Sequence, residues 1–273
     1  MKKIFAILAV LFSLPAFAQF NAPVPNMGAA TTGTWILPYG QFEDEFCGNT
    51  PSTTATIGDL GWDKTVVVAG TNPVAAIASV AGHQCLISLT TNTTATNGVN
   101  ISLGNAVGTT FPGTDTNWQA EFIFNQVAIT ATQNVKVGYM THDNAAVIPT
   151  TGVYVRNIFG TDAAFEVCSD TSSTETCTTY TSSTGVVPAA GDWIDVYFYS
   201  TTSTTVGYKI VDVSGTSTGV QSVTGTVCPS GCTLTATVPT TVMSPAFQVS
   251  ELASSSAAVI DVDTFAYAST VVK

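Results

Sequence analysis

Apolar and polar residues alternate with a period of two through most of the chain after Gln41. The apolar positions of the clearest runs fall within residues 118–124, 135–139, 153–155, 165–167, 194–198, 206–210, 247–249 and 258–262. Clusters of Gly, Asn, Asp, Ser and Thr separate these runs, and no helical period of comparable length accompanies them. Because successive side chains of a strand point to opposite faces, the pattern predicts an all-β chain folded as an antiparallel two-sheet β-sandwich.

Two of these runs contain the candidate ligand-binding residues. Within residues 193–199, the apolar set predicts the core face, so that Tyr197 and Tyr199 share the opposite face. Glu121 lies opposite the apolar face of residues 118–124 in the same way. A pair of tyrosines on an open sheet can stack on sugar rings, whereas the same pair between two sheets only fills the core. The sequence leaves both interpretations open.

The beginning of the chain predicts where the protein resides. Residues 1–18 contain two lysines, an apolar stretch too short to span a bilayer, and the cleavage pattern Ala16-Phe17-Ala18, which together are typical of a secretory signal peptide. The mature chain is therefore predicted to be secreted or periplasmic, with no transmembrane anchor. Residues 19–40 contain several prolines and no clear period, and we expect an extended leader or linker there. Residues 41–273 are predicted to form one β-sandwich domain.

The charge balance limits the possible partners. The chain has seven Lys and Arg residues against eighteen Asp and Glu residues, for a net charge of −11. Binding to nucleic acid requires clustered cations that displace phosphate counterions, and no such cluster is present, so we expect no nucleic-acid partner. The remaining partners are a neutral glycan, a cation or a surface protein. Nothing in the sequence determines the oligomeric state.

Six cysteines follow the signal peptide, which in an exported chain predicts up to three disulfides. The sequence alone leaves their connectivity open, although proximity along the chain favours bridging a hairpin and a short turn. A zinc site is the alternative, but the cysteine separations are irregular and lack matched Cys-x2-Cys pairs. The favoured disulfides are Cys47–Cys85, Cys168–Cys177 and Cys228–Cys232.

Several short motifs with aromatic residues follow one another in a recognisable order. They are Phe42-Glu43-Asp44-Glu45-Phe46, Ile57-Gly58-Asp59-Leu60-Gly61-Trp62, Gly82-His83, Trp118-Gln119-Ala120-Glu121-Phe122, Gly191-Asp192-Trp193 and Asp261-Val262-Asp263-Thr264-Phe265. This succession resembles concanavalin-A-like (lectin/glucanase, laminin-G-like) jelly-roll domains, in the divergent variety of tailed-phage structural proteins and secreted bacterial proteins. The resemblance covers roughly residues 41–268. It implies a two-sheet sandwich with a concave face, often used for glycan binding or virion attachment, and no catalytic residue.

Catalytic and metal-binding patterns are weak. Glucanases of this family carry an alternating Glu-x-Asp-x-Glu arrangement on one strand, and this sequence does not match it. No Gly-x-Ser-x-Gly nucleophile motif is present, and His83 at a turn is expected to be structural. Jelly-roll domains often bind calcium, but the chain has no Asp-x-Asp-x-Asp-Gly loop, so we predict no cofactor. If calcium binds, Asp261 and Asp263 are the candidate metal ligands.

Three functional hypotheses follow. The first is a secreted, non-catalytic jelly-roll module that binds a neutral glycan or a protein partner at a cell or virion surface. The second is a structural subunit of an extracellular or phage assembly. The third is a diverged polysaccharide-degrading enzyme, which would require two carboxylates facing one site.

Overall fold

The computed structural model describes most of the predicted domain. The described residues are 41–44, 46, 56–58, 60–67, 73–80, 83, 85–93, 97–103, 118–141, 151–172, 174–202, 205–215, 221–234, 238–239, 243–253 and 256–269. The predicted signal peptide (1–18), the predicted leader (19–40) and Cys47 lie outside them. In this part of the chain, no helix is long and apolar enough to cross a membrane.

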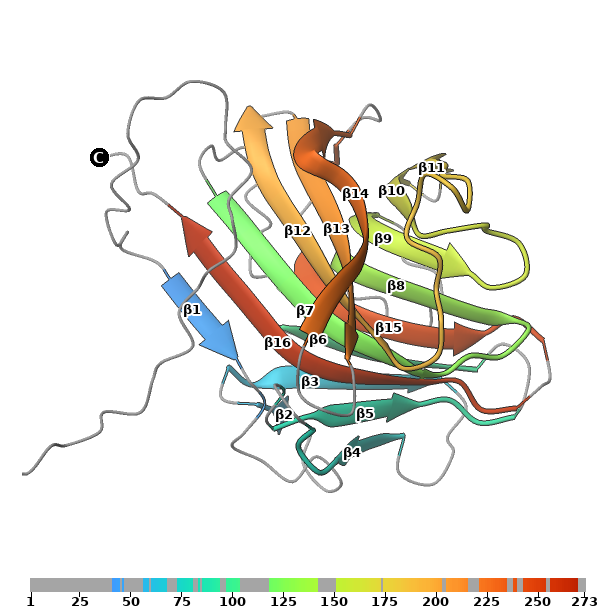
Figure 1. Cartoon of the computed structure of the whole chain (residues 1–273). Helices are drawn as coiled ribbons and strands as arrows, with labels where there is room; N and C mark the ends of the chain where they lie inside the picture. Colours follow the sequence, from blue (N-terminus) through green and yellow to red (C-terminus); the bar gives the residue numbers. More distant parts are fainter. Residues whose placement is uncertain are drawn as a thin grey trace, which may run out of the picture. The chain divides into compact units, whose positions relative to one another are not determined.

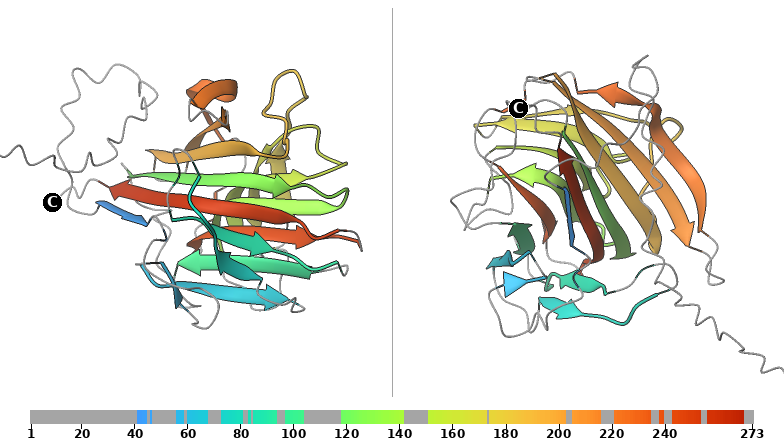
Figure 2. Two further views of the ribbon diagram at one scale, coloured as in Figure 1. Left: turned by 60° about the horizontal axis from the view of Figure 1, so that its bottom comes forward. Right: turned by 90° about the vertical axis from the view of Figure 1, so that its left-hand side faces the viewer.

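The described elements are strands, and they form two antiparallel sheets that lie in separate layers (Figure 1 and Figure 2). Sheet A contains, in spatial order, β14 (Gln221–Thr233), β13 (Thr205–Gly215), β12 (Asp192–Thr202), β7 (Trp118–Ala128), β16 (Val259–Ser269), β5 (Ile87–Thr90) and β4 (Val74–Ala76), and β1 (Gln41–Asp44) pairs with β16. Sheet B contains β11 (Thr174–Thr178), β10 (Glu166–Thr171), β9 (Gly152–Ile158), β8 (Gln133–Met140), β15 (Ser244–Glu251), β6 (Asn97–Leu103), β3 (Trp62–Val67) and β2 (Thr56–Ile57). The predicted all-β, two-sheet antiparallel sandwich is thereby confirmed.

The core lies between the sheets, and aromatic rings from both sheets meet at its centre. Phe122 on β7 has its ring centroid 4.9 Å from that of Phe265 and 6.1 Å from that of Phe198, both in sheet A. From sheet B, the rings of Phe247 and Tyr139 approach the same residue at 5.5 and 5.7 Å. Tilted and edge-on aromatic pairs stabilise a core beyond the area that they bury. This cluster therefore joins the two layers.

The first two motifs of the sequence meet at one buried carboxylate. Asp44, at the end of β1, accepts hydrogen bonds from the backbone N–H of Phe46 at 2.8 Å and of Leu60 at 2.9 Å, and from the indole Nε1 of Trp62 at 3.1 Å. Gly58 has a φ of +68°, and a Cβ atom there would lie 2.5 Å from an oxygen of Asp44. Glycine is thus required both by its backbone conformation and by the close carboxylate.

A β-bulge interrupts the alternation of β16. The register against β7 pairs Val262 with Phe124 but Thr264 with Ile123, so that Asp263 is the additional residue. The bulge lets Val262 and Phe265, three residues apart, both enter the core. A bulge of this kind changes the direction of the side chains beside it.

The described cysteines form one disulfide between paired strands and one within a single strand. The disulfide Cys168–Cys177 joins a directly opposed pair of residues on β10 and β11. Cys228 and Cys232, both within β14, form a second disulfide. Cys85 is also disulfide-bonded, and its predicted partner, Cys47, lies outside the described residues.

Replacing Phe122 by alanine tests the central role of this ring. The Phe122→Ala variant should lose about 3–5 kcal/mol of unfolding free energy, because it leaves a cavity between both sheets. Guanidinium denaturation followed by tryptophan fluorescence measures this loss. The matched control on the same strand is Val127→Ala, whose side chain is exposed and whose replacement should change stability by no more than about 0.5 kcal/mol. Equal losses in both variants would contradict the assignment.

Candidate functional site

The outer face of sheet A carries several carboxyl groups, a lysine and aromatic side chains on neighbouring strands. The core-facing positions of β7 and β12 leave their intervening residues on this face. Strand register places Tyr197 between Glu121 of β7 and Lys209 of β13. We use the name acidic face for the outer surface of sheet A formed by Glu121, Ile123, Asn125, Trp193, Asp195, Tyr197, Lys209, Asp261 and Asp263.

Tyr197 lies at the centre of one row of the acidic face. Its hydroxyl hydrogen-bonds to the carboxylate of Glu121, and the amino group of Lys209 lies 5.5 Å from its ring centroid. Burial, followed by the charges of Glu121 and Asp195, raises the pKa of Tyr197 above its ordinary value. The row therefore presents a half-buried aromatic ring between an acceptor and a cation.

Asp195 occupies the next row, opposite Ile123 and Val211. Burial raises the pKa of Asp195 to about 7, with further increases from the negative charges of Glu121 and Asp263 and a partly compensating decrease from Lys209. A carboxyl group of this kind exists in both protonation states near neutral pH. It can therefore act as a hydrogen-bond donor or as an acceptor.

A segment between β4 and β5 lies over part of the acidic face. Ile77 and Leu86 pack against Trp193, and the backbone N–H of Ile77 donates to the carbonyl of Leu86 at 2.9 Å. His83 stacks on Trp193 with ring centroids 3.5 Å apart, and its Nδ1 lies 2.6 Å from Oδ2 of Asp263. Both His83 and Asp263 are buried. The hydrogen bond and the stacking together hold this segment on sheet A.

The three predicted ligand-binding residues lie close together on the outer face of sheet A. Tyr197 and Glu121 are in direct contact, and Tyr199 lies two residues further along β12 on the same face. The ring of Tyr199 lies against Gly207 of β13, where a Cβ atom would approach its Cε2 atom to 2.2 Å. The absence of a side chain at Gly207 therefore provides the space for this ring.

The predicted metal ligands are both on the acidic face but have different partners. Asp261 hydrogen-bonds to Ser88 on β5, and burial raises its pKa. Asp263, the bulge residue, pairs instead with His83. Among the described residues, the one cluster with metal-ligand geometry is Glu166 with Cys168 and Cys177. These two cysteines form a disulfide and so have no thiolate to offer a metal.

The sequence interpretation did not single out Asp195. It expected His83 to be structural, and it gave no indication that this residue contacts Asp263. The contact of His83 with Asp263 joins residues 180 positions apart, for which the sequence contains no local signal. Asp195 could have been found from its place beside Tyr197 in the same alternation, but its electrostatic neighbours lie on other strands.

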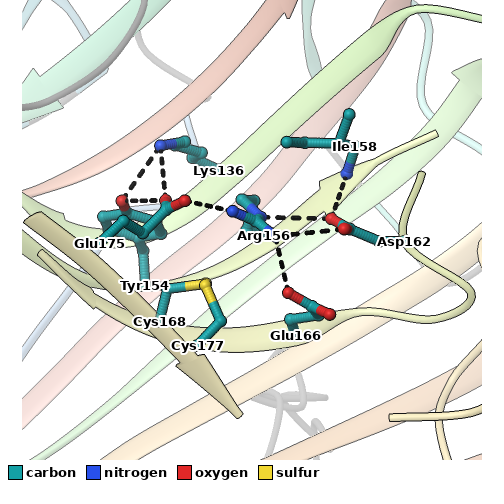
Figure 3. The surroundings of a disulfide bond; sticks show 9 residues. All are labelled: Lys136, Tyr154, Arg156, Ile158, Asp162, Glu166, Cys168, Glu175 and Cys177. Carbon is teal, nitrogen blue, oxygen red and sulfur yellow. Dashed lines mark hydrogen bonds and ion pairs between the residues drawn. A yellow bond between two sulfur atoms is a disulfide. The ribbon is translucent and has the colours of Figure 1, made fainter. Parts of the chain in front are cut away.

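A second cluster of charged residues lies on sheet B beside the Cys168–Cys177 disulfide (Figure 3). The amino group of Lys136 lies 3.0 Å from Oε1 of Glu175 and donates to the hydroxyl of Tyr154 at the same distance. The hydroxyl of Tyr154 donates to Glu175 at 2.5 Å, and Arg156 pairs with Glu175 as well.

Arg156 connects this group to two further carboxylates. Its guanidinium lies 3.1 Å from Asp162 and 2.7 Å from Glu166. Lys136 and Arg156 therefore both have carboxylate partners, and Glu175 ties the edge strand β11 to strands β8 and β9. This arrangement stabilises the hairpin of β10 and β11, and we assign it a structural role.

Comparison with known proteins identifies the fold. No protein-family model matches the chain, and no curated protein matches its sequence. A protein of unknown function from Shewanella oneidensis MR-1 is similar in structure, with a TM-score of 0.50 and 14% identity over 82% of this chain and 90% of that one. Peanut lectin has a TM-score of 0.49 and 11% identity, over 86% of this chain and 100% of that one. A lichenase from a mouse hindgut metagenome has a TM-score of 0.47 and 9% identity, over 84% and 99%. The similarity to the Shewanella protein extends to most of both chains and indicates that the two share a fold, which in this chain is a two-sheet antiparallel sandwich.

The Glu175 cluster generates a prediction about acid stability. Burial acts to raise the pKa of Glu175, but Lys136, Tyr154 and Arg156 outweigh it and hold the pKa below the ordinary 4.5. A depressed carboxyl pKa contributes stability above the unfolded-state value, and this contribution is lost as the pH falls through the folded-state value. Glu175→Gln should therefore be less stable than the parent protein at pH 7, and the difference should shrink below pH 4.5.

Urea denaturation of both proteins across this pH range makes the measurement. The exposed Thr176 on the same strand offers a control, because Thr176→Ala removes no charge and should show a difference that is independent of pH. A Glu175→Gln deficit that stays constant down to acid pH would show that the ion pairs add nothing.

Proposed function

We propose that this protein is an exported jelly-roll module that binds a glycan without acidic groups through the acidic face of sheet A. The observation that carries the proposal is the row formed by Glu121, Tyr197 and Lys209. Sugar rings are recognised by an aromatic surface for their C–H face and by a few fixed polar groups for their hydroxyls. This row supplies both the aromatic surface and the polar groups on neighbouring strands of one sheet.

Two features support the choice of ligand class. Tyr199 continues the aromatic surface along β12, about 7 Å from Tyr197 by strand geometry, so that more than one sugar unit can make contact. The carboxylates of Glu121 and Asp195 repel sulfated or carboxylated polymers, in agreement with the net charge of −11.

The export of the chain is part of this proposal. Disulfides persist mainly in oxidising compartments, and the described cysteines are all disulfide-bonded. We propose that residues 1–18 are the signal peptide that directs the chain there, that residues 19–40 form the leader, and that the remainder functions as one domain. Mass spectrometry of the mature protein would identify its first residue.

A second candidate function is favoured by Asp195. Hydrolysis of a glycosidic bond requires a carboxylic acid that is protonated near neutral pH and a second carboxylate nearby. The raised pKa of Asp195 and its interaction with Glu121 on the adjacent strand match these two requirements. A reducing-end assay on polysaccharides separates the two functions, because a binding module releases no new ends.

The assembly-subunit hypothesis stays a prediction, which light scattering would test.

The binding proposal predicts the effect of changing Tyr197. On a glycan array and in fluorescence titration with the bound oligosaccharide, Tyr197→Ala should bind at least about tenfold more weakly, because it removes the stacking surface. Tyr197→Phe keeps the ring and should lose less.

Tyr267 provides the control for this test. It is a half-buried tyrosine of β16 that packs against the core, so that Tyr267→Ala removes a ring from the other side of sheet A. This variant should retain full affinity once folded. An array without any bound glycan, or an unchanged affinity of Tyr197→Ala, would overturn the proposal.

A further inference from the structure

Hydrogen-bond acceptors greatly outnumber donors on the acidic face. Among its described residues, Glu121, Asp195, Asp261 and Asp263 contribute carboxyl groups, and Lys209 is the one side chain with a permanent positive charge. Ionised carboxylates only accept hydrogen bonds. The face as it stands therefore needs positive charge and donors, which a bound molecule can supply.

His83, Tyr197 and Lys209 supply donors at the face, and each of them already has a partner there. His83 is bound to Asp263 and stacked on Trp193, and the hydroxyl of Tyr197 is bound to Glu121. The amino group of Lys209 lies over the Tyr197 ring. The raised pKa of Asp195 is the electrostatic consequence, because burial and the charges of Glu121 and Asp263 outweigh Lys209.

An independent observation comes from the amide of Asn125. The residue is 8% exposed, its Nδ2 donates to the carbonyl of Gly191 at 3.3 Å, and its Oδ1 has no hydrogen-bond partner. An unsatisfied buried acceptor is costly and calls for a donor that the protein itself does not provide. Strand register places Asn125 beside Trp193 and Asp261, one step along the face from Asp195.

An ammonium group matches this set of acceptors. It supplies three donors and a positive charge, and it has no acceptor of its own. A sugar hydroxyl supplies one donor and no charge, so it satisfies the same face only in part. An N-acetyl group removes the charge altogether.

We propose that the glycan bound at the acidic face carries a free amine, as in an N-deacetylated amino sugar, and that its ammonium group binds at Asp195, with Glu121 and Asn125 on either side along β7. The inference rests on the proposed glycan site and specifies its ligand. The sugar ring then lies over Tyr197, on the same strand as Asp195.

The test compares two oligosaccharides of equal length, a glucosamine oligomer and its fully N-acetylated counterpart. In calorimetric titration of the full mature chain at low salt, the glucosamine oligomer should bind at least about tenfold more tightly. This preference should shrink in about 1 M salt, because salt screens the attraction between the ammonium group and the carboxylates.

Two variants move the preference in opposite directions. Asp195→Asn keeps the shape of the side chain but removes its charge, and should lower affinity for the amine oligomer by a larger factor than affinity for the acetylated one. Lys209→Met removes the opposing cation and should raise the ratio of the affinity for the amine oligomer to that for the acetylated one, although it also removes a polar contact that both oligosaccharides share. A change in folding alone would affect both oligosaccharides equally, so the ratio of the two affinities is the readout.

The outcomes separate the inference from the function beneath it. Equal binding of both oligosaccharides would overturn the inference and leave the glycan site intact. Binding of neither, together with a silent glycan array, would overturn both. An oligolysine peptide that binds as tightly as the glucosamine oligomer would show that the face selects cations in general, and would also overturn the amino-sugar assignment.

Discussion

The register of β7 is the constraint on which the site depends. Phe122 contacts aromatic rings from both sheets at the centre of the core, so a shift of this strand by one residue would expose its whole apolar set. Because alternate side chains of a strand point to opposite faces, burial of that apolar set places Glu121 and Asn125 on the outer face. The same argument applies to β12, where burial of the intervening apolar residues places Asp195 and Tyr197 beside them. Burial of the apolar face of β7 and β12 therefore determines which residues form the acidic face on the outer side of sheet A.

The charged residues of the two sheets differ in how they are paired. This difference distinguishes the structural cluster on sheet B from the candidate binding site on sheet A. On sheet B, Lys136 and Arg156 meet carboxylates at ion-pair distances, and this pairing stabilises a buried network. On sheet A, four carboxyl groups share one face with a single lysine, and burial together with the charges of Glu121 and Asp263 raises the pKa of Asp195 to about 7. A cluster with paired charges is complete without a ligand. An under-neutralised cluster beside aromatic rings is a better candidate for binding, because a ligand can supply what the protein lacks.

Irregular features of the backbone complete the acidic face. The bulge of β16 adds Asp263 to the strand at the point where His83 can reach it. His83 in turn stacks on Trp193 and holds the segment before β5 against the sheet. Gly207 leaves room for the ring of Tyr199 on the neighbouring strand. Each of these departures from a regular strand lies next to a side chain of the candidate site, which is where bulges and glycines are often found.

The sequence by itself determined the class of fold and the two faces of its main strands, because alternation is local and burial of apolar residues decides which side points inward. It therefore predicted the two-sheet antiparallel sandwich and placed Tyr197 and Tyr199 on one face. Tertiary structure alone decided which strands became neighbours. The meeting of Asp195 with Glu121, of His83 with Asp263, and of Glu175 with Lys136 and Arg156 depends on strand pairing and on the bulge. These contacts join residues far apart in the chain, and nothing in the local pattern of either partner encodes them.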